Sequence, residues 1–134
     1  EVMCIVDLDT VMPGLIHYDF GDMVRTLTSP ADEDERDLDK VTMRMDFFDA
    51  LAKGYLSEAN DFLSEAEKGY LAQAGKVITF QLGVRFLTDH LNGDTYFRVH
   101  REGQNLDRAR VQFKLVERML ENEEAMKATI AALG

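Results

Sequence analysis

Apolar residues recur at helical spacing through most of this 134-residue chain. They fall three or four residues apart over residues 38–55, and similar spacing returns after residue 105. This spacing places apolar side chains on one face of a helix, where they can pack against a neighbour. Val2–Val6 is instead a continuous apolar run, which is typical of a buried strand. The sequence therefore predicts a mostly α-helical chain of about five helices with a short N-terminal β-strand.

Polar residues indicate where the first helices begin and end. Helical spacing covers Tyr18–Leu27, and the acidic stretch Ser29–Asp37 reads as a solvated loop whose charges favour the start of the next helix. We expect that helix over Leu38–Tyr55. Ser64 followed by Glu67 is a capping-box pattern, so a further helix should begin there.

Glycine and asparagine residues divide the second half of the chain. Gly75 predicts a break between a short helix and a longer one, and Asn92–Gly93 predicts where the longer one ends. The longer helix is apolar on several sides, so we expect it to be the central buried helix. Thr95–Val99 reads as a short extended segment, and the last helix should follow a cap at Asn105.

Length and charge limit the classes of function. The chain is long enough for one domain, covering residues 1–134, and not for two. A net charge of −10 argues against nucleic-acid binding and against docking on an anionic membrane. No apolar stretch is long enough to span a bilayer, and Glu1 and the run after it lack the basic start and cleavage pattern of a signal peptide, so we expect a cytoplasmic location.

Two aspartates follow the predicted strand. Asp7 and Asp9 are two residues apart, so on a straight strand their side chains point to the same side. Paired carboxylates at a strand end suit Mg²⁺, which prefers oxygen ligands and keeps other positions for substrate phosphates. An acidic turn that caps the next segment is an equally ordinary interpretation of this spacing.

The string Asp7–Val11 also satisfies the opening motif of phosphatases of the haloacid dehalogenase type. In that class Asp7 would be the nucleophile and Asp9 the general acid/base. That fold is a parallel sheet of alternating strands and helices, however, and strand-like runs are almost absent after Val11. A helical interaction domain without chemistry is the third hypothesis.

Three stretches together carry a resemblance that covers nearly the whole chain. Ile5–Asp22 reads IVDLDTVMPGLIHYDFGD, Arg85–Asp89 reads RFLTD, and Asn105–Val116 reads NLDRARVQFKLV. These stretches resemble the aminoglycoside phosphotransferase-like small-molecule kinases, in particular the N-acetylhexosamine 1-kinase branch. The resemblance implies the helical part of a kinase-like C-terminal lobe, with ATP and Mg²⁺ as cofactors of the parent enzyme and an N-acetylhexosamine phosphorylated at its anomeric hydroxyl.

The resemblance also assigns roles to individual residues. It implies that Asp7 coordinates the Mg²⁺ that bridges the nucleotide phosphates, with Asp9 as a further metal carboxylate. Asp19 would support the catalytic loop by hydrogen bonds to its backbone. The literal Asp-Phe-Gly at Asp19 should begin a helix, so we do not interpret it as the metal-binding motif of protein kinases. Arg85 and Tyr96 would face the sugar substrate.

The residues alone leave other interpretations of these side chains open. Arg85 could equally extend to the surface or pair with Asp89 one turn later, and Tyr96 could pack in the core. The four arginines near the last helix, which we expect to balance the acidic surface rather than bind phosphate, are Arg98, Arg101, Arg108 and Arg110.

The catalytic base of such a kinase lies upstream of the metal aspartate, so no catalytic residue is predicted within this chain. We therefore expect a C-terminal fragment of a longer polypeptide that is inactive by itself. The strand Val2–Val6 would then lack its pairing partner, and a dimer formed through that edge is one way to cover it.

Overall fold

The computed structural model describes Cys4, Leu8 and residues 11–134. The helical elements within them are α1 Ile16–Thr28, the 3-10 helix η1 Leu38–Lys40, α2 Met45–Ala59, α3 Glu65–Leu91, α4 Gln104–Glu121 and α5 Glu123–Leu133. These described residues contain no strand, and the prediction of a mostly α-helical chain is confirmed. The predicted strand Val2–Val6, and with it the dimer edge, lies outside the described residues apart from Cys4.

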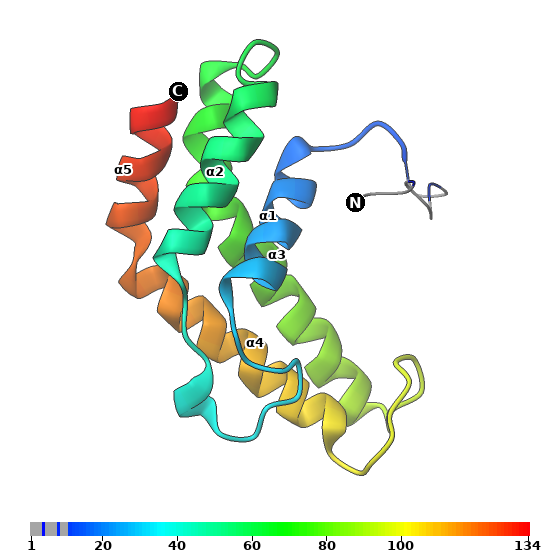
Figure 1. The fold of residues 1–134 in the computed structure, drawn as a ribbon. Coiled ribbons are helices and arrows are strands. Elements are labelled where there is room, and N and C mark those ends of the chain that lie inside the picture. The colour runs from blue at the N-terminus through cyan, green and yellow to red at the C-terminus, as the bar shows by residue number, and fades with distance from the viewer. Residues whose placement is uncertain (1–3, 5–7, 9–10) are drawn as a thin grey trace.

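α3 is the central element, as predicted for the apolar helix of this region. It packs against α1, α4 and α5, whereas α2 packs against α1 and α5. Figure 1 shows α3 running the length of the molecule, with α4 turning back along its C-terminal half. α3 is not buried on all sides, however, because Val77, Phe80 and Val84 are 59%, 55% and 41% exposed.

The main core is formed by buried residues of all five helices. Phe20 of α1 and Phe48 of α2 are fully buried, and their rings meet edge to face with centroids 6.3 Å apart. Tyr55 packs on Phe20 at 5.0 Å. Burial of such rings is among the largest apolar contributions to the stability of a small bundle.

Two glycines let α1 and α3 approach closely. A Cβ atom at Gly21 would lie 2.6 Å from the carbonyl oxygen of Ala74, and one at Gly75 would lie 2.7 Å from a methyl of Val24. Both distances are well inside van der Waals contact, so these positions exclude a side chain. The predicted break at Gly75 is wrong, because α3 is continuous there and glycine serves the helix crossing instead.

The helix predicted over Leu38–Tyr55 is also corrected, since α2 begins only at Met45. Before it, the backbone N–H of Arg44 donates to the carbonyl of Thr28 at 2.9 Å, and Val41 is fully buried. Arg118 of α4 donates to the carbonyl of Val41 at 3.2 Å. These tertiary contacts use backbone groups that a helix would need for itself, so residues 41–44 between η1 and α2 stay outside any helix.

The acidic loop is fastened to the start of α4. Arg101 donates to Asp34 at 3.1 Å and to Asp107 at 2.7 Å, and Arg108 pairs with Glu33 at 3.1 Å. The expectation of a freely solvated loop is therefore wrong in this respect. Arg101 and Arg108 balance acidic side chains, as predicted for this arginine cluster.

The remaining helix ends match the predictions only in part. The capping box at Ser64 and Glu67 is confirmed, and α3 ends at Asn92 as expected. The predicted extended segment is an irregular loop instead. Asn105 is not a cap, because α4 already begins at Gln104 after Gly103, whose φ of 71° suits glycine. The last helix is interrupted at Asn122, where α5 follows α4.

Candidate functional site

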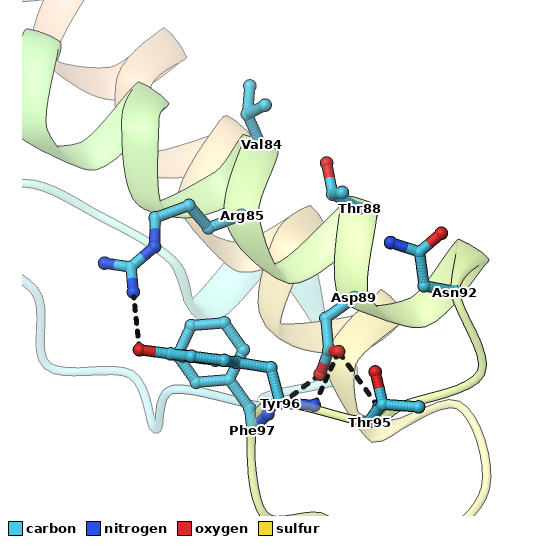
Figure 2. A pocket seen from close by; sticks show the side chains of 8 residues that line it. All are labelled: Val84, Arg85, Thr88, Asp89, Asn92, Thr95, Tyr96 and Phe97. Carbon is cyan, nitrogen blue, oxygen red and sulfur yellow. Dashed lines mark hydrogen bonds between the residues drawn. The ribbon is translucent and has the colours of Figure 1, made fainter.

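A pocket of about 360 Å³ lies where the C-terminal end of α3 meets the loop that leads to α4. Figure 2 shows its lining side chains, which come from two turns of α3 and from the loop. They are Val84, Arg85, Thr88, Asp89, Asn92, Thr95, Tyr96 and Phe97. Both residues predicted to face the substrate are therefore in one pocket, although eleven positions separate them in the sequence.

Arg85 and Tyr96 contact each other in the lining of this pocket. An Nη atom of Arg85 donates to the Tyr96 hydroxyl at 3.5 Å, and the guanidinium lies 5.7 Å from the Tyr96 ring centre and 5.3 Å from that of Phe97. Tyr96 is 74% exposed, so it does not pack in the core. Arg85 reaches the surface over two aromatic rings, which is a favourable position for a cation.

Asp89 does not pair with Arg85, as one interpretation of the sequence allowed. Its carboxylate is buried and accepts three backbone N–H groups of the loop, those of Thr95, Tyr96 and Phe97, at 3.0, 2.8 and 2.9 Å. A fourth hydrogen bond comes from the side-chain amide of Asn105 at 2.9 Å. In Figure 2 dashed lines join the carboxylate of Asp89 to the loop around Thr95 and Tyr96.

These hydrogen bonds also set the charge of Asp89. Burial acts to raise the pKa of its carboxyl, but the N–H groups of Phe97, Tyr96 and Thr95 favour the carboxylate and together lower the pKa below its usual value. Asp89 is therefore ionised at neutral pH, and its four hydrogen bonds are made to a negatively charged acceptor.

Asn105 connects this carboxylate to α4. It is fully buried and donates to Asp94 at 2.9 Å as well as to Asp89, while it accepts a hydrogen bond from Arg108 at 2.9 Å. Asp94 has a φ of 57°, a left-handed conformation that aspartate tolerates better than most residues. The sequence predicts neither contact: it offers Asp89 only as a partner of Arg85 and Asn105 as a helix cap, because the true partners lie across the loop.

The pocket offers polar groups beside an aromatic surface. The Arg85 guanidinium, the Tyr96 hydroxyl and the polar side chains of Thr88 and Asn92 can hydrogen-bond a ligand that carries several hydroxyl or amide groups. The Phe97 ring packs on Phe86 with centroids 4.6 Å apart, which supports the loop from beneath. The arrangement suits binding of a small polar ligand.

The predicted metal aspartates, Asp7 and Asp9, both lie outside the described residues. In the part of the chain that the structure describes, no cluster of three or more His, Cys, Asp or Glu side chains could hold a metal ion. Asp19 is exposed in the first turn of α1, as expected of a residue near a helix start. Its support of a catalytic loop stays a prediction.

A second hollow adjoins the first along α3. It measures about 730 Å³ and shares Val84 and Arg85 with the pocket. Its other lining residues are Tyr18, Lys76, Val77, Phe80, Gln81, Val116 and Leu120. Several of these side chains are apolar and about half exposed, so we call this hollow the apolar groove.

No protein-family model matches this chain. Among the helices that the structure describes, none combines the length and the apolar character needed to cross a membrane.

Proposed function

We propose that this chain forms the acceptor-binding helical part of an ATP- and Mg²⁺-dependent small-molecule kinase. The acceptor in this proposal is an N-acetylhexosamine, GlcNAc or GalNAc, phosphorylated at its anomeric hydroxyl. The pocket of Arg85 and Tyr96 would bind the sugar. A cytoplasmic location goes with this proposal.

The observation that carries the proposal is the pairing of Arg85 with Tyr96. The family resemblance predicts that both residues face the substrate, and an Nη atom of Arg85 lies 3.5 Å from the Tyr96 hydroxyl in the lining of one pocket. The guanidinium of Arg85 and the phenol hydroxyl of Tyr96 can hydrogen-bond sugar hydroxyls. The exposed ring of Tyr96 can stack on the apolar face of the sugar. The polar lining from Thr88 and Asn92 supports the same class of ligand.

Asp7 carries the nucleotide side of the proposal. Asp7, with Asp9 beside it, would hold Mg²⁺, and ATP would supply the phosphoryl group. A base that accepts the proton of the sugar hydroxyl is also needed, and none is assigned within these 134 residues. We therefore expect the chain to bind the sugar without phosphorylating it.

Sugar binding is tested by titrating the isotopically labelled chain with GlcNAc and GalNAc and following its amide resonances. The largest shifts should fall on Arg85, Tyr96 and their neighbours in the pocket. Tyr96→Ala should weaken binding between about two- and tenfold, because it removes one stacking ring. Tyr70→Ala is the matched control. Tyr70 lies on α3 and is exposed like Tyr96, but it is not part of the pocket. Shifts confined to other surfaces, or equal effects of both variants, would contradict the proposal.

The absence of catalysis is tested separately. The purified chain is incubated with ATP, Mg²⁺ and GlcNAc, and the products are followed by phosphorus NMR. We expect no sugar phosphate to form. ATP-dependent formation of a sugar phosphate would show that the chain holds a complete active site, and the proposed division of roles would be wrong.

The apolar groove favours one alternative, a helical interaction domain. Half-exposed Val77, Phe80 and Leu120 form an apolar surface of the kind found at contacts with other proteins. Self-association that Phe80→Ser abolishes, together with no response to either sugar, would favour this alternative. The phosphatase hypothesis finds no support, because residues 11–134 hold no strand and so cannot supply the parallel sheet of that fold.

A further inference from the structure

The carboxylate at the end of α3 binds the loop rather than the solvent, and the loop carries Tyr96. We propose that Asp89 is a positioning residue for the ligand pocket, which holds Tyr96 beside Arg85 by binding three successive backbone N–H groups. This inference rests on the proposed function for the identity of the ligand. The placement of Tyr96 by Asp89 can be tested without any ligand.

A carboxylate is the group that this position requires. All four of its partners are donors, namely the backbone N–H groups of Thr95, Tyr96 and Phe97 and the side-chain amide of Asn105. Ionised aspartate offers acceptors on both oxygens, whereas asparagine has a donor on one of its two terminal atoms. Asparagine at position 89 would therefore place an N–H group against other donors and leave buried groups without partners.

Tyr96 depends on this anchor because its own side chain gives it little support. Tyr96 is 74% exposed, and the centroid of its ring lies 4.8 Å from that of the Phe97 ring in an edge-to-face arrangement. Its backbone N–H makes the shortest of the three loop bonds to Asp89, at 2.8 Å. A loop that is already ordered before the ligand arrives avoids the entropy cost of ordering on binding. Release of the loop should therefore appear as a loss of affinity.

The role of Asp89 is local. The buried apolar residues Phe86, three positions before Asp89, and Ala109, four positions after Asn105, both lie outside the main core cluster, which residues of all five helices form. Removing the carboxylate should therefore release the loop while the bundle stays folded. This separation distinguishes a positioning residue from one that merely stabilises the fold.

The first experiment measures amide hydrogen exchange of Thr95, Tyr96 and Phe97. We expect all three amides to be protected in the unaltered chain and to lose that protection in Asp89→Asn. Asp49→Asn is the matched control, because Asp49 lies on α2 and accepts a hydrogen bond from the Thr129 hydroxyl rather than from backbone groups. The control should leave the three amides unchanged.

The second experiment is a double-mutant cycle with sugar affinity as its readout. Asp89→Asn should weaken GlcNAc binding by about tenfold at most, which is the scale of ordering a short loop. If Asp89 acts through Tyr96, the substitution should have no further effect in a Tyr96→Ala background. Equal effects of Asp89→Asn in both backgrounds would overturn the positioning role.

The two proposals fail in different ways. If neither sugar shifts any resonance of the unaltered chain, the proposed function fails, and the exchange rates alone decide the role of Asp89. If Asp89→Asn does not fold, the unaltered chain decides instead. Exchange of its three loop amides at the rates of an unstructured peptide would overturn the inference, and protection of all three would support it.

Discussion

The close approach of α1 and α3 predicts different effects on stability for the same substitution at two helical glycines. Alanine at Gly21 would place a Cβ atom 2.6 Å from the carbonyl oxygen and 2.8 Å from the carbonyl carbon of Ala74. Both atoms are backbone, so no side chain can rotate away, and the helices must separate. Alanine at Gly69 meets nothing within 4 Å.

The magnitudes follow from two terms. Replacing an exposed helical glycine with alanine stabilises a helix by about 1 kcal/mol, so Gly69→Ala should raise the free energy of unfolding by about that amount. Gly21→Ala gains the same helix term but adds an overpacked contact, which costs about 1–3 kcal/mol. Because the helix term is common to both variants, their difference isolates the contact, and we expect Gly21→Ala to be less stable by about 1–3 kcal/mol.

The assay is urea unfolding followed by helical circular dichroism, with one common slope for both variants. Gly54→Ala on α2 is a second control, since Gly54 also has open space around it. If Gly21→Ala stabilises the chain as much as Gly69→Ala does, within about 0.5 kcal/mol, the two helices do not touch at Gly21 and the reasoning is refuted.

Two further predictions concern the core and the loop anchor. Phe48→Ala should lower the free energy of unfolding by about 3–5 kcal/mol in urea titrations, because Phe48 is fully buried against Phe20, whereas Phe62→Ala should change it little, because Phe62 is 69% exposed. Lowering the pH should release the loop only in acid, because folding lowers the pKa of Asp89. The contribution of Asp89 to stability is fully present above its unfolded pKa of about 3.9, and it is lost as the pH falls through the lower pKa of the folded state. The loop amide resonances should thus stay constant from neutral pH to about pH 4, and a common shift above that pH would contradict the assignment.

Local signals in the sequence predicted the fold well where local contacts decide it. The capping box at Ser64 and the stop at Asn92 depend on residues within one turn, and both are confirmed. The predicted break at Gly75 is wrong because the constraint on this glycine lies on another helix, in the side chain of Val24. The late start of α2 was missed for a similar reason, since the backbone of Arg44 bonds to Thr28 sixteen residues earlier.

The candidate site shows the same division. Arg85 and Tyr96 were selected through the family resemblance, and the structure places them in one pocket. The role of Asp89 could not be predicted, because three of its four partners are backbone N–H groups that carry no signal in the sequence. Periodicity alone would assign a buried aspartate on an apolar helix to an ion pair.

α3 places the packing core and the ligand pocket on one helix but far apart. Gly75, at the crossing with α1, and Asp89, at the loop, are fourteen positions apart on this helix, which corresponds to roughly 21 Å along its axis. Substitutions separated by such a distance usually act independently. The exposed residues of the candidate pocket could therefore vary in sequence while the helix crossing at Gly75 keeps its geometry.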